Sequence, residues 1–281
     1  MKALYDVPAP AKLNLFLHIT GRRPDGYHLL QSVFMLIDWC DTLHFERRPH
    51  AQISREDLGS ALPADDLTLR AARALQAATG CTQGAHLSVF KRIPAQAGMG
   101  GGSSDAASTL LALNRLWGLK LDLPDLSRIG LALGADVPFF LCGRNAWAEG
   151  IGERITPLEN ASQLPKARFV VVKPTAGLDT KNIFSSPSLK RNSDSATILG
   201  FTATHYDFGR NDLQRVAQTL CPDVTQALQW LASHGLHGRM TGSGSAVFAK
   251  IPQAIDFLDA PREWQIKVCE NLMIHPLAGW V

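Results

Sequence analysis

A glycine-rich segment from Ala97 to Ser108, AGMGGGSSDAAS, is the part of the chain best suited to holding a phosphate. Glycine lets backbone N–H groups approach a ligand with no Cβ in the way. An alanine- and leucine-rich run follows at once and predicts a helix, whose first N–H groups lack partners and carry positive potential. Ser103 and Ser104 add hydroxyl groups for a phosphate or a magnesium ion, and Ser104 or Asp105 is expected to cap the helix. The segment predicts that the chain binds a nucleotide.

The segment fits neither of the common nucleotide-binding loops. A Walker A loop ends in Lys-Ser or Lys-Thr, and no such pair follows the glycines. The G-x-G-x-x-G pattern also fails, because Ser103 stands at its third glycine position. A flexible linker is the alternative, and the helical pattern directly after the glycines argues against it.

Three polar residues elsewhere have types and spacing that suit alcohol chemistry. Asp136 stands in GADVPFF, after a helix-ending glycine, where a carboxylate can accept a proton from an alcohol; an aspartate in a capping turn before Pro138 is the alternative. Lys12 and Asn14 lie two residues apart on a predicted strand and so share one face. A lysine beside an aspartate favours the ionised carboxylate and neutralises phosphate charge, whereas an ordinary polar strand face explains the same spacing.

A second Gly/Ser loop, TGSGSA, runs from Thr241 to Ala246. It indicates another close approach of the backbone to a ligand, and a plain hairpin turn is the alternative. Neither loop has G-x-S-x-G spacing, which argues against a hydrolase with a nucleophile elbow.

Hydrophobic periodicity indicates mixed helices and strands. The turns and prolines between Gly150 and Lys166 place a domain boundary near Asn160, which gives two domains, residues 1–160 and 161–281. The opening resembles a β-meander, with no early βαβ unit of a dinucleotide fold. Glycines close two of the predicted helices, and the serine-rich segment 185–197 is expected to be a mobile loop. The predicted strands are Lys12–Thr20, Val33–Ile37, Thr42–Glu46, His86–Ile93, Ala167–Val172 and the second part of 238–250; the predicted helices are Asp66–Thr79, one after the glycine loop, one around Leu126–Leu133, Asp212–Leu220 and Val224–His234.

Composition limits the class of protein. The 281 residues are 46% hydrophobic and 19% charged, as in globular proteins, and the net charge of +3 is too small to argue for nucleic acid or a membrane as partner. No apolar run has the length of a membrane span, and the N-terminal residues lack the pattern of a signal peptide, so we expect a cytoplasmic protein. Five scattered cysteines without C-x-x-C spacing are expected to be buried free thiols.

In chain order, three motifs resemble those of the GHMP kinase superfamily: PAKLNLFL (Pro10–Leu17), PAQAGMGGGSSDAAS (Pro94–Ser108) and GRMTGSGSAVFA (Gly238–Ala249). The run DGYHLLQSVF (Asp25–Phe34) is most similar to the members that phosphorylate a cytidine-diphosphate derivative in isoprenoid precursor synthesis. The resemblance covers the chain from about Pro8 to Ala249 and is weakest from Ser185 to Tyr206.

This resemblance implies an α+β fold with ATP and substrate in a cleft between two domains. The first domain would resemble domain 2 of ribosomal protein S5, and the second a ferredoxin-like α/β plait. It also implies that Asp136 is the base, that Lys12 assists it, and that ATP acts with Mg²⁺, without saying which side chains bind the metal. Met99 departs from the leucine common in relatives, a nearly volume-neutral exchange.

The remaining site residues also come from the resemblance. A cytosine would stack on aromatic rings and hydrogen-bond to the GYH segment. The expected partner is this small-molecule substrate, and the choice between monomer and dimer stays open. A kinase for another alcohol, such as mevalonate or homoserine, and a non-catalytic binding protein of this fold are the alternatives. The expected ATP-binding residues are Lys91, Pro94, Ala95, Gln96, Ala97, Gly98, Met99, Gly100, Gly101, Gly102, Ser103 and Ser104; the expected substrate-binding residues are Asn14, Tyr27, His28, Phe184, Thr241 and Gly242.

Overall fold

A long antiparallel hairpin forms the first part of the computed structural model, which describes residues 1–158, 163–252 and 259–281. Its strands are β1 (Ala3–Arg22) and β2 (His28–Arg48). The prediction of separate strands at 33–37 and 42–46 was wrong, because β2 continues through both. Asp41 interrupts the apolar pattern between them, yet it lies fully buried opposite Ala9 and accepts hydrogen bonds from backbone N–H groups of a neighbouring loop.

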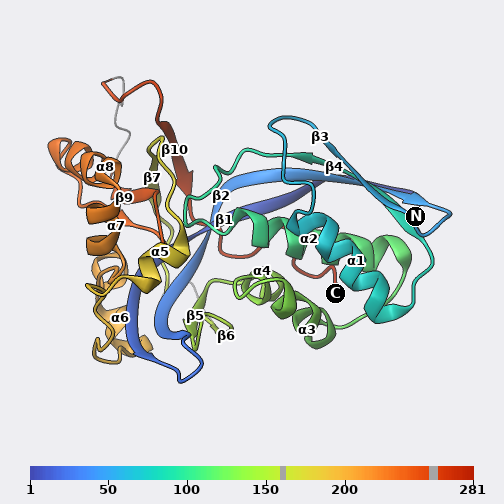
Figure 1. The fold of residues 1–281 in the computed structure, drawn as a ribbon, viewed down its shortest axis with the longest axis horizontal. Helices are drawn as coiled ribbons and strands as arrows, with labels where there is room; N and C mark the ends of the chain where they lie inside the picture. Colours follow the sequence, from blue (N-terminus) through green and yellow to red (C-terminus); the bar gives the residue numbers. More distant parts are fainter. Residues whose placement is uncertain (159–162, 253–258) are drawn as a thin grey trace.

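The hairpin belongs to a six-stranded sheet with the order β3-β4-β2-β5-β6, with β1 also paired to β2. Four helices pack on one face of this sheet and bury an apolar core against it (Figure 1). The further strands are β3 (Ile53–Asp57), β4 (Gly84–Phe90), β5 (Ala146–Glu149) and β6 (Arg154–Pro157), and the helices are α1 (Leu67–Thr79), α2 (Gly101–Trp117), α3 (Leu123–Leu133) and α4 (Val137–Cys142).

The helix ends follow local sequence signals in most places. Asp66 caps the N-terminus of α1, and Gly80 ends that helix in the left-handed region, as predicted. Gly134 likewise follows the last residue of α3. The expectation that Ser104 or Asp105 caps α2 was wrong: the N–H of Ser104 already donates to the carbonyl of Gly100 at 2.9 Å, so helical geometry starts at the glycines.

A second sheet, with the order β10-β7-β9-β8, forms the other lobe. Its outer face is covered by α7 and α8 (Figure 1), and its inner face packs against the hairpin. The predicted strand near 167–172 and both predicted helices are present. The elements are β7 (Arg168–Lys173), α5 (Thr180–Ser185), α6 (Ile198–Thr204), the 3₁₀ turn η1 (His205–Asp207), α7 (Gln214–Leu220), α8 (Pro222–Ser233), β8 (Arg239–Met240), β9 (Val247–Ile251) and β10 (Gln265–Glu270).

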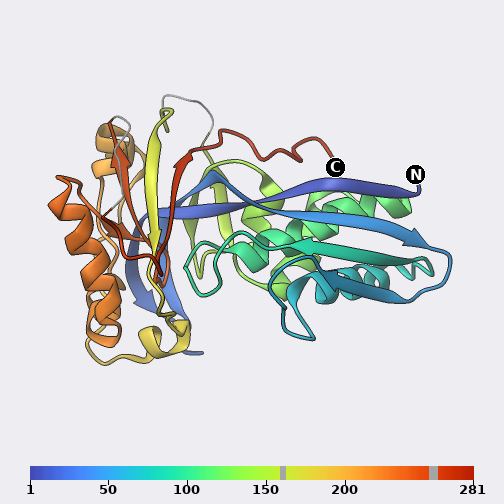
Figure 2. The same cartoon turned by 90° about the horizontal axis from the view of Figure 1, so that it is seen from above.

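Segments distant in sequence join the two lobes. Leu17 and Leu30, near the far end of the hairpin, lie in the core of the second lobe with Val170. The segment after β10 returns to the first lobe (Figure 2), where the N–H of Leu272 donates to the carbonyl of Leu36 at 2.9 Å. The proposed boundary at residue 160 lies outside the described residues and stays a prediction.

Two further expectations concern thiols and membranes. All five cysteines are free, Cys221 and Cys269 being buried and the other three partly buried. Among the described residues, no helix combines the length and the apolar character needed to cross a bilayer.

Candidate active site

The two glycine loops pack directly against each other. The N–H of Ser245 donates to the carbonyl of Gln96 at 3.1 Å, and the N–H of Ala246 donates to that of Ala97 at 3.3 Å. Gly98 has a φ of +70°, and a Cβ there would lie 2.2 Å from the carbonyl oxygen of Thr241. A side chain at this position would therefore force the loops apart.

The first loop leads straight into the N-terminus of α2. The first intrahelical hydrogen bond comes from the N–H of Ser104, so the N–H groups of Gly101, Gly102 and Ser103 have no acceptor within the helix. The helix dipole adds positive potential at this end. The arrangement is an anion site of the kind that binds nucleotide phosphates.

A cavity of about 960 Å³ lies over this loop and extends between the lobes. Four predicted residues are not part of its lining. Ser104 and Thr241 are fully buried behind it, Tyr27 is exposed, and His28 lies beside Phe184. The predicted residues that the cavity brings together are Lys12, Asn14, Lys91, the loop from Pro94 to Ser103, Asp136, Phe184 and Gly242.

Lys12 and Asp136 face each other in this cavity. Lys12 Nζ lies 3.5 Å from Asp136 Oδ2, and the two side chains are 5% and 28% exposed. The lysine Nζ also donates to Asn14 Oδ1 at 2.5 Å and lies 4.5 Å from the centroid of the Phe34 ring. Asp136 precedes α4, yet its side chain makes no capping hydrogen bond. The carboxylate therefore does not serve as the N-cap of α4 and is available to a ligand in the cavity.

Asn14 connects the lysine to the second glycine loop. Its Nδ2 donates to Ser32 Oγ at 2.9 Å, and its backbone N–H donates to Thr241 Oγ1 at 2.9 Å. The shared face of Lys12 and Asn14, predicted from their spacing, is thus present. These bonds hold the lysine amine in one place without using the carboxylate of Asp136.

A buried cluster of charges supports the start of α2. Lys91 forms ion pairs with Asp41 and, at 2.5 Å, with Asp105 Oδ2. Burial raises the pKa of Asp105, and the Lys91 ammonium opposes that rise. A Cβ on Gly101 would lie 3.5 Å from Lys91 Nζ, so the cluster borders the glycine loop at the start of α2.

Neither Asp41 nor Asp105 was predicted to be a site residue. The available signal was weak: Asp41 follows a mainly apolar run, and a buried carboxylate there requires a cation or hydrogen-bond donors as partners. Other polar residues that line the cavity were also missed; they are Asp65, Asp66, Asp179, Thr180 and Ser243.

The rings predicted to recognise a base lie at the far end of the hairpin and on α5. The His28 and Phe184 rings have centroids 5.1 Å apart and planes tilted by 35°. Tyr27, beside them on the turn, is 59% exposed, and the Arg23 guanidinium lies 5.9 Å from its ring centroid. An exposed tyrosine near two packed rings is an arrangement that can stack on a planar ligand.

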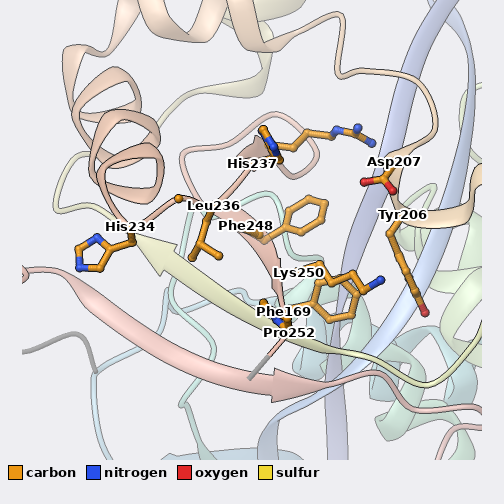
Figure 3. Close-up of a pocket in the computed structure, with 12 residues that line it drawn as sticks. Phe169, Tyr206, Asp207, His234, Leu236, His237, Phe248, Lys250 and Pro252 are labelled. Carbon is orange, nitrogen blue, oxygen red and sulfur yellow. The ribbon is translucent and has the colours of Figure 1, made fainter. Parts of the chain in front are cut away.

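A separate cavity of about 600 Å³ lies at one end of the second sheet. Figure 3 shows Phe169, Phe248 and Tyr206 along it, and the Nζ of Lys250 lies 5.3 Å from the centroid of the Tyr206 ring. None of the predicted site residues lines this cavity. The cavity between the lobes is therefore the candidate active site.

Family comparisons agree with this geometry. The chain matches the model of the GHMP kinases N terminal domain over residues 66–144 and that of the GHMP kinases C terminal domain over residues 202–259. These matches and the two-lobed fold of mixed helices and strands define an ATP-dependent GHMP kinase. The glycine loop beside the Lys12–Asp136 pair agrees with that class.

Individual relatives show which family of GHMP kinases the chain belongs to. The 4-diphosphocytidyl-2-C-methyl-D-erythritol kinase of Paracidovorax citrulli is 73% identical over 280 residues, covering 100% of this chain and 98% of the relative. The kinase of that name from Delftia acidovorans is 68% identical, with coverage of 100% and 98%. The chain therefore belongs to the family of 4-diphosphocytidyl-2-C-methyl-D-erythritol kinases, in the non-mevalonate pathway of isoprenoid synthesis.

Solved structures give the same result. A crystal structure of 4-(cytidine 5'-diphospho)-2C-methyl-D-erythritol kinase superposes with a TM-score of 0.78 at 31% identity, covering 96% of this chain and 98% of the other. Homoserine kinase from Cytophaga hutchinsonii superposes with a TM-score of 0.70 at 13% identity, with coverage of 98% and 96%. The second likeness concerns the fold alone.

Proposed function

We propose that the chain transfers the γ-phosphoryl group of ATP to the 2-hydroxyl of 4-diphosphocytidyl-2-C-methyl-D-erythritol, giving the 2-phosphate and ADP. The observation that carries this proposal is the Lys12–Asp136 pair, 3.5 Å apart, in one cavity with the glycine loop and Phe184. It supplies a base beside a phosphate site and an aromatic face for a nucleobase. The names of the relatives supply the identity of the alcohol.

Asp136 acts as the general base in this proposal. Its carboxylate accepts the proton of the tertiary hydroxyl as the hydroxyl oxygen bonds to the γ-phosphorus. The bond between that phosphorus and the bridging oxygen of ATP breaks, and ADP leaves with the electron pair. Because the carboxylate makes no capping hydrogen bond, it turns toward the alcohol without disturbing α4.

Lys12 and the glycine loop stabilise charge in the transition state. The lysine is held by Asn14 and Phe34, so its ammonium is already in place when negative charge develops on the transferred group. The free N–H groups at the start of α2 hold the phosphates of ATP, with the loop from Pro94 to Ser103 around them. Positioning and charge neutralisation are the main contributions that such a transfer needs.

The residues beside the loop fit Mg²⁺ as a companion of ATP. The described residues hold no cluster of three or more metal-ligating side chains, and Mg²⁺ is typically held by substrate phosphates, water and one or two protein oxygens. The Ser103 hydroxyl faces the turn before Asp136, since a Cβ on Gly134 would lie 3.6 Å from Ser103 Oγ. Ser103 would be the protein oxygen that helps to hold the ion, which would supply neutralisation of phosphate charge.

The cytidine group binds at the hairpin end. Tyr27 and Phe184 offer aromatic faces to the base, and His28 offers hydrogen bonds to its edge. Asn14 and Gly242 line the path from there to the glycine loop, and Thr241 supports them from behind by accepting a hydrogen bond from the N–H of Asn14. We place the reaction in the cytoplasm, because both substrates are highly charged and do not diffuse through a bilayer.

A substrate panel tests the proposal. ADP release would be measured with magnesium-ATP and the diphosphocytidyl-methylerythritol, mevalonate, homoserine or galactose. Turnover with the cytidine compound alone supports the proposal. Turnover with another alcohol would retain the kinase site and reject the base-recognition part, and no turnover with any of them would favour a non-catalytic binding protein.

A further inference from the structure

Arg191 lies in the segment between α5 and α6 and is bonded to the end of α5. Its Nη2 donates to the carbonyls of Ser186 at 2.7 Å and Phe184 at 3.3 Å, and its Nη1 donates to that of Leu189 at 3.0 Å. A cation suits the C-terminus of a helix, where carbonyls lack intrahelical donors. The guanidinium thereby fixes the backbone that carries the Phe184 ring.

The same guanidinium reaches across to the far end of the hairpin, at the start of β2. Arg191 Nε donates to His28 Nε2 at 3.0 Å. A guanidinium has donors only, so His28 Nε2 must be the acceptor, and the neutral ring then carries its proton on Nδ1. Among the described residues, none forms a hydrogen bond with His28 Nδ1, and this atom stays accessible to solvent. One N–H donor is left for a ligand.

The charges around His28 support this form of the ring. Burial lowers the pKa of His28, and the cations of Arg191 and of Arg22, at the end of β1, lower it further. Protonation would put a proton on Nε2 against the arginine and break their hydrogen bond. His28 therefore stays a neutral ring with a defined donor.

We propose that Arg191 is a positioning residue for base recognition: it holds His28 as the Nδ1–H tautomer, packed beside Phe184, so that the imidazole donates to an acceptor atom on the edge of a pyrimidine. This inference rests on the proposed function, in which His28 faces the cytosine. Cytosine offers O2 and N3 as acceptors. Arg191 itself contacts neither the base nor the reacting atoms.

Histidine tautomers can be read directly by ¹⁵N NMR, without any substrate. In the wild-type protein at pH 7, His28 should show a protonated Nδ1 and an unprotonated, hydrogen-bonded Nε2. In Arg191→Met the ring should shift toward the Nε2–H tautomer, and its pKa should rise. Lys190→Met removes an exposed neighbouring cation and should leave the His28 signals unchanged. An unchanged His28 spectrum in Arg191→Met overturns the inference.

Kinetics then separate positioning from general structural support. Arg191→Met should raise KM for the cytidine substrate by about tenfold to a hundredfold, the range for loss of one charged hydrogen bond, with kcat and KM for ATP changing less than about twofold. In a His28→Ala background the same substitution should add almost nothing. Equal effects in both backgrounds would mean that Arg191 only supports α5, and the inference would fail.

The two proposals fail separately. If the wild-type enzyme does not phosphorylate the cytidine substrate, the proposed function is rejected, whereas the NMR result still reports on Arg191 and His28. If the wild-type enzyme is active but the tautomer and KM do not respond to Arg191→Met, only the inference about Arg191 is rejected.

Discussion

Asp136→Asn is the substitution that isolates the proposed base. The change keeps the size of the side chain and removes its ability to take a proton. Because Asp136 is 28% exposed, makes no capping bond and lies 3.5 Å from Lys12 Nζ, we expect the free energy of unfolding to change by less than about 1 kcal/mol. Any large loss of activity in this variant then reports on chemistry.

The expected loss follows from the task assigned to the carboxylate. A positioned general base contributes about 10²- to 10⁴-fold, which corresponds to about 2.7–5.4 kcal/mol of activation free energy. We therefore expect kcat to fall by that factor while the Kd for ATP changes less than about threefold, since the phosphates lie on the N–H groups of α2. Stopped assays of ADP release, isothermal titration with ATP and urea unfolding measure the three quantities.

A matched control removes the same charge elsewhere. Asp125 lies on the outer part of α3 and pairs with Arg128 at the surface. Asp125→Asn should keep kcat within about twofold of the wild type. If Asp136→Asn keeps more than a tenth of the wild-type kcat, the assignment of the base is refuted; if it unfolds or loses ATP binding, the carboxylate has a structural role that the geometry does not include.

Three further predictions concern other parts of the structure. Lys12→Met should lower kcat at least a hundredfold, because it removes the ammonium that stabilises charge in the transition state. It also leaves Asn14 Oδ1 unpaired, so the free energy of unfolding measured in urea should fall by about 1–3 kcal/mol. An unchanged kcat would contradict the role of Lys12 in catalysis. Gly98→Ala should raise KM for ATP more than about tenfold, because the added Cβ would force the two glycine loops apart. Gly80 has a similar positive φ but open space around it, so Gly80→Ala should only lower the free energy of unfolding by about 1–2 kcal/mol. The same KM for ATP in both variants would contradict the packing of the loops. Burial lowers the pKa of His275 from 6.5 to about 4, so between these values the unfolded chain binds more protons than the folded one, and the free energy of unfolding falls as pH drops through that window. In His275→Gln the dependence of the free energy of unfolding on pH should correspond to about one proton fewer. An unchanged pH dependence in this variant would contradict the prediction.

Much of the candidate site could be predicted because its signals are local. The glycines from 98 to 102 encode a turn and a helix start within a few residues, and the resulting loop lines the cavity. The spacing of Lys12 and Asn14 placed them on one strand face, where they are now seen bonded. The glycines that end α1 and α3 gave those helix boundaries correctly.

Other features depend on partners far along the chain. Asp41 lies between the two strands predicted at 33–37 and 42–46, but Lys91 and two backbone N–H groups about fifty residues away satisfy its charge, and β2 continues through it. The pairing of Arg191 with His28 spans 163 residues and joins the segment after α5 to the end of the hairpin, so no window of sequence contains it. Burial of a charge is decided by tertiary structure, which periodicity alone does not describe.

The central claim is a phosphoryl transfer from ATP to the alcohol of the cytidine compound, and ³¹P NMR of that reaction tests it most directly. With the wild-type enzyme, Mg²⁺ and ATP, we predict one new phosphomonoester signal that grows as ATP is converted to ADP, while the diphosphate of the cytidine compound stays intact. ATP loss that yields only inorganic phosphate, or no phosphomonoester at all, would contradict the account.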